Sequence, residues 1–442
     1  MQDLKLSKSK FSILFLIVLS VSIYVVFTSY TNKLNPRYPV VIICMSGFRT
    51  DYLKLVEESL GNEAVEQFTM LTSSGIKIIT PKHVFPMTTL SNLQSFLTGL
   101  YPNQHEIFGD YFYNKENKKV FDASLNFKDV NSDWIRANET KSPIWYSLEM
   151  NELRTASLSW PLNELKFKGK TPFKVIDYKT SSENLTIADK FEVISEWLTI
   201  PGMSLIMAYF DEPGQTAKLN GTNNEVIGKV IAELNQGLRN LSNFCSKKSL
   251  RYNLFLFSES TTIPIVKDER TSVENCISDR HEYRVFISDS LALIYLEEER
   301  NLHDNMTSLE VAQEIVNEMR FCEEKLTPYL WANAPAPLKL TEEVTSTTPD
   351  IVILPPSGHL FINNGRNIVN NNTRLKSVKG YSSVLALMNS MFILNGPSFR
   401  SKLQIANIEI VDFYQVICQI LKVPPHPHMG SEQILKRILF SD

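Results

Sequence analysis

Short apolar runs alternate along this chain with longer segments in which apolar residues recur at helical spacing. The runs have the length and near-continuous hydrophobicity of buried strands. They are residues 40–44, 76–79, 204–209, 253–257 and 351–354. Helical spacing is clearest at residues 225–244 and 309–319. This alternation predicts an α/β fold, a three-layer α/β/α sandwich around a mostly parallel central sheet.

The N-terminal region carries a different pattern. Residues 11–30 contain no charged side chain, and twenty residues are enough to cross the hydrocarbon core of a membrane as a helix. Because Lys5, Lys8 and Lys10 precede this segment, the positive-inside rule places residues 1–10 in the cytosol. We therefore predict a type II signal anchor at 11–30, a stalk at 31–38 and an extracellular or lumenal domain at 39–442. The alternative is a cleaved signal peptide, with a secreted product that begins near Asn32.

Composition adds little beyond excluding one class of partner. The chain is 43% apolar and 21% charged, as is usual for a globular protein, and its net charge is −3. The absence of a long basic run argues against nucleic acid as a partner. No linker-like break follows residue 40, which favours a single large domain.

Six ordered segments carry candidate chemistry. They are VIICMSGFR (41–49), FPMTTLSN (85–92), TGLYPNQH (98–105), YFDEP (209–213), FLFSES (255–260) and KGYSSVLALMNSM (379–391). Their order and spacing resemble the ecto-nucleotide pyrophosphatase/phosphodiesterase family of the alkaline phosphatase superfamily. The resemblance extends from about Pro39 to Leu439. In an open α/β sheet, sites form beyond the C-terminal ends of the strands, and Ser46, Gly214 and Glu259 each follow a predicted strand, so we expect these positions to converge.

That family uses two zinc ions, and the resemblance implies which positions would bind them. Here those positions hold Ser46, Gly214, Lys218, Glu259, Ser260 and Ser382. Only Glu259 is a carboxylate, and none of the seven histidines falls on a family metal position. Because zinc needs three or four Cys, His or carboxylate donors, we predict no metal site and no cofactor.

Three further positions belong to the same implied site. The family nucleophile maps to Thr89, whose alternative interpretation is the N-cap of the helix that follows. An Asn that donates a hydrogen bond to phosphate maps to Asp110, whose ionised carboxylate can only accept one. Tyr178 keeps one half of the family's aromatic clamp for a nucleotide base, while Leu90 replaces the other half.

Loss of the metals would leave acidic groups without a cation. A buried carboxylate without a partner is costly, and Lys218 is the cation that stands at a former metal position. One prediction is that its ammonium lies within about 4 Å of Glu259 or Asp110. The alternative is that Lys218 points into solvent.

Cysteines and glycan sequons fit an extracellular protein. The resemblance implies a disulfide between Cys276 and Cys322, with Cys245 as the second choice of partner. The Asn-x-Ser/Thr sequons, each a candidate glycan site, are at Asn138, Asn184, Asn220, Asn240, Asn305 and Asn371.

Two functions follow from these observations. The first is a catalytically inactive, membrane-anchored member of the family that binds a nucleotide-like ligand or a protein partner. The alternative is an active phosphodiesterase or hydrolase that cleaves nucleotide or other phosphodiesters with a rebuilt site. Fold alone does not separate them, because activity belongs to the site.

Overall fold

The structure is a computed structural model of the 442-residue chain. It describes residues 37–123, 141–222, 225–266, 270–288, 290–297, 306–322, 326–335, 344–362, 375–381 and 389–440. Residues from Pro39 onward form one compact unit, and the segment up to Tyr38 is a separate one. The predicted anchor at residues 11–30 lies outside the described residues, among which no helix is long and apolar enough to cross a membrane.

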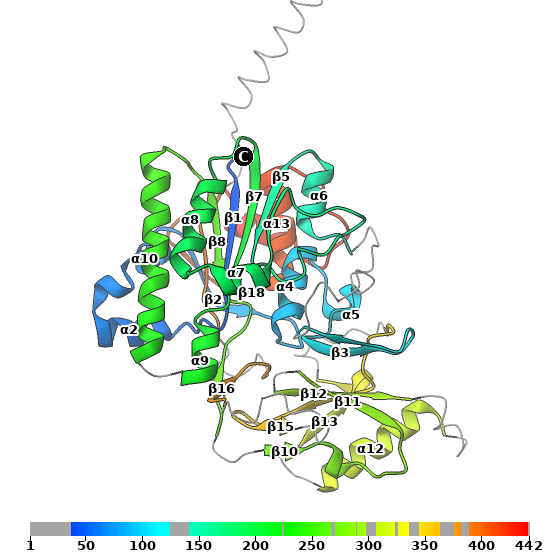
Figure 1. Ribbon diagram of the computed structural model, residues 1–442. Coiled ribbons are helices and arrows are strands. Elements are labelled where there is room, and N and C mark those ends of the chain that lie inside the picture. The colour runs from blue at the N-terminus through cyan, green and yellow to red at the C-terminus, as the bar shows by residue number, and fades with distance from the viewer. Residues whose placement is uncertain are drawn as a thin grey trace, which may run out of the picture. The chain divides into compact units, whose positions relative to one another are not determined.

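An eight-stranded sheet forms the centre of the fold (Figure 1). Its strands, in spatial order, are β18 (Leu403–Glu409), β2 (Ile76–Lys82), β17 (Phe392–Asn395), β8 (Asn253–Phe257), β1 (Val40–Met45), β7 (Met203–Phe210), β5 (Arg154–Leu158) and β6 (Lys174–Ile176). All neighbours pair in parallel except that β17 runs antiparallel to β2 and β8. The predicted α/β class with a mostly parallel sheet is therefore confirmed.

Helices cover both faces of this sheet, as Figure 1 shows. Alternate residues of β1 enter opposite cores, because successive side chains of a strand point to opposite faces. One face packs against α2 (Tyr52–Leu60), α3 (Glu66–Ser74), α8 (Ile187–Trp197) and α10 (Glu225–Lys247). The other packs against α4 (Thr89–Thr98), α6 (Ile144–Met150), α13 (Phe413–Leu421) and α14 (Gln433–Ile438).

A second sheet is antiparallel and is missing from the sequence-based prediction. It contains β11 (Tyr283–Ser288), β12 (Leu291–Leu296), β14 (Ile351–Leu354) and β13 (Thr327–Leu330), in that order. The apolar run at 351–354 forms the expected strand, but in this sheet and not in the central one. We call this sheet and the helix α12 (Ser308–Cys322) that packs on it the disulfide lobe.

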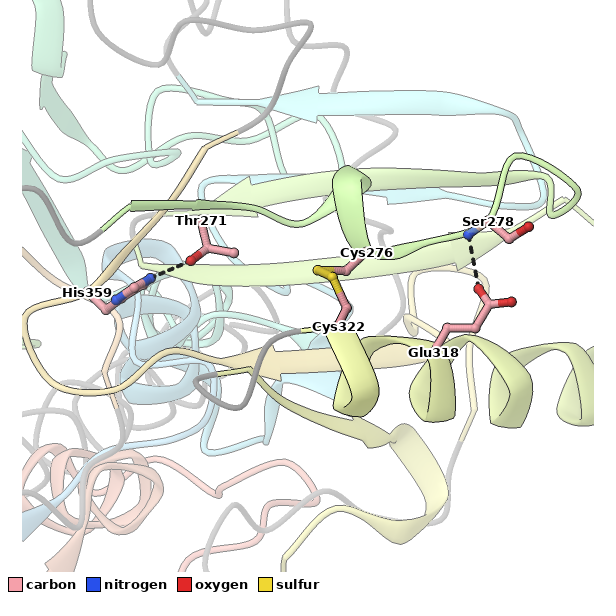
Figure 2. Close-up of a disulfide and its surroundings, with 6 residues drawn as sticks. All are labelled: Thr271, Cys276, Ser278, Glu318, Cys322 and His359. Carbon is pink, nitrogen blue, oxygen red and sulfur yellow. Dashed lines mark hydrogen bonds between the residues drawn. A yellow bond between two sulfur atoms is a disulfide. The ribbon is translucent and has the colours of Figure 1, made fainter.

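A disulfide joins α12 to the segment before β11 (Figure 2). It connects Cys276 and Cys322, with 5.5 Å between their Cα atoms, so the predicted pairing is confirmed and Cys245 is a buried free thiol. The amide of Ser278 donates a 3.0 Å hydrogen bond to the Glu318 carboxylate of α12 beside the bridge. A covalent bond and a hydrogen bond thus fix this helix to the segment that precedes β11.

The remaining strands and α-helices of the described residues are short. They are β3 (Tyr111–Asn114), β4 (Lys119–Asp122), β9 (Ile263–Pro264), β10 (Arg270–Ser272), β15 (Leu360–Ile362), β16 (Ser377–Val378), α5 (Pro102–His105), α7 (Tyr178–Asn184) and α9 (Gly214–Asn220). Of these, α7, α9 and β16 carry or precede residues of the site described next.

Candidate functional site

The candidate site lies where parallel strands of the central sheet end. Ser46 directly follows β1, Glu259 follows β8, and Gly214 begins α9 shortly after β7. The amide of Gly214 donates a 2.8 Å hydrogen bond to the Ser46 carbonyl. The strand ends therefore bring these three positions together, as the strand order of an open α/β sheet leads one to expect.

Glu259 is the centre of the site. Its side chain is 0% exposed, and its Oε1 accepts hydrogen bonds from the hydroxyls of Ser46 at 2.8 Å, Thr89 at 3.0 Å and Ser260 at 3.0 Å. The Cys44 thiol donates to Oε2 at 3.3 Å. These four hydrogen bonds satisfy the buried carboxylate and fix its position.

A lysine supplies the positive charge that this carboxylate needs. The ammonium of Lys379, just after β16, donates to Glu259 Oε1 at 2.9 Å and to Thr89 Oγ1 at 3.0 Å, and it also donates to Ser46 Oγ. Its side chain is 15% exposed. Lys379 thus lies among the residues that the resemblance maps onto metal positions, and it places a positive charge beside Glu259.

The prediction that Lys218 provides this charge is wrong. Lys218 is in α9 and lines the space above Lys379, but no ion pair within 4.0 Å joins it to Glu259 or Asp110. Lys379 reaches Glu259 from the β16 side and occupies its accepting oxygen. Glu259 does have a lysine counter-ion, but the lysine comes from another segment.

The ionisation of Glu259 follows from these contacts. Burial raises its pKa, but the charge and hydrogen bond of Lys379 and the hydroxyl of Ser46 outweigh burial and leave the pKa below its ordinary value. Glu259 is therefore a carboxylate at neutral pH, and the Lys379 ammonium is its counter-ion.

Thr89 keeps its hydroxyl at the site, although it is not the helix cap. The N-cap position of α4 belongs to Thr88, so the interpretation of Thr89 as the cap is wrong. The Thr89 hydroxyl instead donates to Glu259 and accepts from Lys379. To attack phosphorus it would have to lose its proton, and a carboxylate whose pKa is lowered is a weak base for an alcohol.

Asp110 and Tyr178 also line this site. The Asp110 carboxylate accepts a 3.1 Å hydrogen bond from the Leu90 amide, so it satisfies a free amide in the first turn of α4. Tyr178 is the first residue of α7. Burial, and then the charge of Asp211, raise the pKa of its hydroxyl to about 12.

These residues enclose a pocket of about 190 Å³. Ser46, Thr89, Asp110, Tyr178, Asp211, Gly214, Lys218 and Lys379 are among its lining residues. Of the remaining candidates, Glu259 and Ser260 are buried beneath it, and Ser382 lies outside the described residues. Apart from Ser382, all the candidate residues come together at this end of the sheet.

The side chains at this site do not fit two zinc ions. Among the positions that the resemblance maps onto metal ligands, Gly214 has no ligand atom, Lys218 is a cation, and the one carboxylate, Glu259, already accepts from Lys379. Among the residues that the structure describes, no three His, Cys, Asp or Glu side chains are arranged to hold a metal. The donor set that zinc requires is therefore not assembled by these residues.

Backbone packing also opposes a ligand side chain at position 214. A Cβ atom on Gly214 would lie 2.9 Å from the Ser46 carbonyl oxygen, and one on Gly47 would lie 2.5 Å from the Gly214 Cα. Gly47 also has a φ of +73°, which L side chains rarely adopt. Restoring a metal-binding side chain here would require the backbone to move.

A model of the type I phosphodiesterase / nucleotide pyrophosphatase family matches residues 40–382. The chain belongs to this family. It is 23% identical over 412 residues to the ectonucleotide pyrophosphatase/phosphodiesterase family member 3 of Rattus norvegicus, covering 91% of this chain but 44% of that relative. It is also 23% identical over 407 residues to the bis(5′-adenosyl)-triphosphatase of Homo sapiens, covering 91% of this chain and 81% of the relative.

Solved structures of the family share the fold. Murine ectonucleotide pyrophosphatase/phosphodiesterase 5 superposes with a TM-score of 0.77 at 22% identity, covering 91% of this chain and all of that one. The human protein of the same name gives the same TM-score. The architecture of the family is thus retained at an identity too low to transfer activity.

Lys379 is the residue that sequence reasoning missed. It begins the segment 379–391 that carries part of the family resemblance, but it is not at a metal position. The available signal was a lysine directly before Gly380, in a chain where the neighbouring ligand positions are lost. Sequence alone gave no distance from this loop to Glu259.

Proposed function

We propose that this chain is a catalytically silent member of the family that acts by binding. The observation that carries the proposal is the Lys379 ammonium, 2.9 Å from Glu259 Oε1 and 3.0 Å from Thr89 Oγ1. A metal-bound alkoxide is the family's means of attack, and here the corresponding hydroxyl is neutral and held by an ion pair. Binding without turnover is what such a site supports.

A solved relative with a bound nucleotide supports a ligand-binding role for the pocket. One solved relative, murine ectonucleotide pyrophosphatase/phosphodiesterase 5, is described as an inactive Thr→Ala variant in complex with AMP. This chain keeps the pocket and Tyr178 in its wall. A nucleotide-like ligand and a protein partner are therefore both retained as proposals.

Hydrolysis and metal content should be measured on the same purified protein. With bis(p-nitrophenyl) phosphate or diadenosine triphosphate, and with zinc added, the wild type and its Thr89→Ala variant should give equal rates at the buffer background. Metal analysis should find less than one zinc per chain. Turnover that requires Thr89, or two zinc ions per chain, would refute catalytic silence.

The second candidate is a hydrolase that works without zinc. Its support is the position of the Thr89 hydroxyl oxygen, which lies 3.0 Å from the Lys379 ammonium and 3.0 Å from Glu259 Oε1. The ammonium and Oε1 are themselves 2.9 Å apart. In that case the activity would survive EDTA and disappear in Lys379→Met and Glu259→Gln as well as in Thr89→Ala. The same assay therefore separates the two functions.

We also propose that residues 11–30 anchor the chain with its folded part outside the cytosol. Three sequons, at Asn184, Asn220 and Asn240, have exposed side chains, while those at Asn138, Asn305 and Asn371 lie outside the described residues. The protein should resist carbonate extraction, and glycosidase treatment should lower its mass. A soluble product that begins near Asn32 would show cleavage instead.

A further inference from the structure

The charges that line the pocket above Lys379 indicate what kind of ligand it takes, and this inference rests on the proposed binding function. Lys218 and Lys379 line the pocket together with Asp110 and Asp211, and the buried Glu259 pairs with Lys379, so these five charges sum to −1. A dianionic phosphate would find no net positive charge here, because Lys379 is already neutralised by Glu259. The lining therefore does not favour a simple anion.

One positive charge in this wall is free. Lys218 is half-buried, and its ammonium makes no hydrogen bond or ion pair with any residue that the structure describes. An ammonium that faces a partly enclosed pocket without a partner is a natural site for an anionic group of a ligand.

A negative charge lies apart from it in the same wall. The Asp211 carboxylate is 33% exposed, and the only ion pair it forms among the described residues is a long one, 3.9 Å from the Lys190 ammonium. No ion pair within 4.0 Å joins the Asp211 carboxylate to the Lys218 ammonium, so these two charged groups, the poles of the pocket, do not neutralise each other. Each pole can therefore still form an ion pair with a charged group of a ligand.

The uncharged lining residues and the pocket volume restrict the chemistry and the size of the ligand. Tyr178, Pro161 and Val378 contribute ring and apolar surface. A tyrosine ring beside a carboxylate favours an ammonium group. The volume of about 190 Å³ is below the roughly 300–1,000 Å³ of pockets for drug-sized ligands.

We infer that this pocket binds a small zwitterion, with the anionic group on Lys218 and the ammonium group on Asp211 beside Tyr178. Such a ligand contacts both Lys218 and Asp211 at once, which neither a simple amine nor a simple carboxylate can do.

The test is calorimetric titration of the full-length protein in detergent with ω-amino acids from glycine to 6-aminohexanoate. One chain length should bind at least tenfold more tightly than butylamine or butyrate, because only a molecule with both charges at the right spacing reaches both poles. Lys218→Met and Asp211→Asn should each weaken that binding at least tenfold. Lys376→Met, an exposed lysine outside the pocket lining, is the matched control and should leave it unchanged.

Three results would overturn the inference. One is no binding of any ω-amino acid, and another is equal binding of the zwitterion and one of its halves. The third is tighter binding of AMP or inorganic phosphate that is indifferent to Asp211→Asn, which would identify an anion site. Because these are binding measurements, their failure is distinct from Thr89-dependent hydrolysis, which would refute the proposed function and leave the ligand class open.

Discussion

The ion pair at the strand ends and the ion pairs on the disulfide lobe have similar lengths but very different surroundings. Lys379 lies 2.9 Å from Glu259, with the two side chains 15% and 0% exposed. Arg280 lies 3.1 Å from Glu318, with the two side chains 60% and 26% exposed. Distance alone does not distinguish these pairs, so burial must decide what each contributes.

Burial makes the two charges at the strand ends depend on each other. Removing one partner of a buried pair leaves an unpaired charge with no water to solvate it, whereas water screens and solvates a surface charge that loses its partner. We therefore expect a substitution of Lys379 to cost much more stability than one of Arg280 in the disulfide lobe.

The largest expected effect is that of Lys379→Met. At pH 7.5 it should lower the free energy of unfolding by about 3–5 kcal/mol, because Glu259 would remain buried without a cation. Urea unfolding measures this change. The double variant Lys379→Met/Glu259→Gln should recover most of the loss, and a double variant as unstable as the single one would show that lost packing, not charge, is responsible.

Removal of the disulfide should come next. Replacing Cys276 and Cys322 by alanine frees a loop closed over a sequence separation of 46 and should cost about 2–4 kcal/mol. The loss should appear equally in wild-type protein treated with reductant. A reductant that also destabilises the alanine variant would mean that another thiol-dependent contact exists.

The glycines at the strand ends test how tightly the backbone encloses the buried pair. Gly47→Ala should cost about 2–4 kcal/mol, because it combines a φ of +73° with a 2.5 Å approach to the Gly214 Cα. Gly61→Ala is the matched control, since Gly61 has a φ of +85° but nothing within 4 Å of the added atom. It should cost only about 1–2 kcal/mol. Equal losses would show that the close approach contributes nothing.

Glu164 is an intermediate case, a partly buried carboxyl group that forms no ion pair with any residue in the described ranges. Its Oε2 has no hydrogen-bond partner among the described residues, and burial raises its pKa to about 7. Because the folded pKa exceeds the unfolded one, its ionisation destabilises the fold as pH rises towards 7. Glu164→Gln should therefore stabilise by about 1 kcal/mol at pH 8, after allowance for partial exposure, and by nothing near pH 4. Thermal unfolding at both pH values checks this, and a gain that is the same at both would exclude titration as its cause.

The smallest effect should be that of Arg280→Gln. Its surface pairs with Glu314 and Glu318 should contribute less than about 1 kcal/mol, and 1 M NaCl should remove most of that. Salt should change the Lys379→Met effect much less. A loss at Arg280 as large as that at Lys379 would break the comparison between buried and exposed pairs.

Much of the fold was predictable because burial marks strands clearly. The run at residues 253–257 gave the bounds of β8, and the position of Cys276 and Cys322 in the family pattern gave the disulfide. The run at 351–354 was placed in the wrong sheet, because hydrophobicity identifies a buried strand but not its pairing partner.

The site was predictable only in part, for a related reason. The resemblance identified Glu259 as the surviving carboxylate and indicated the need for a cation. It could not identify Lys379, because the contact joins residues 120 positions apart through a loop whose path is set by tertiary packing. The resemblance maps Lys218 onto a metal position of the family, but such a mapping does not tell which side chain pairs with Glu259 in this structure.

The most direct test of the central claim is the difference in free energy of unfolding between wild type and Lys379→Met, measured from pH 5 to pH 8. In the wild type the pKa of Glu259 is lowered, so its stabilising contribution is present above the unfolded pKa of about 4.5 and is lost only as pH falls through the folded value. In Lys379→Met burial would raise that pKa, so the destabilisation should grow with pH, by about 1–3 kcal/mol over this range. A difference that stays constant with pH would contradict the claim that Lys379 serves as the counter-ion of Glu259.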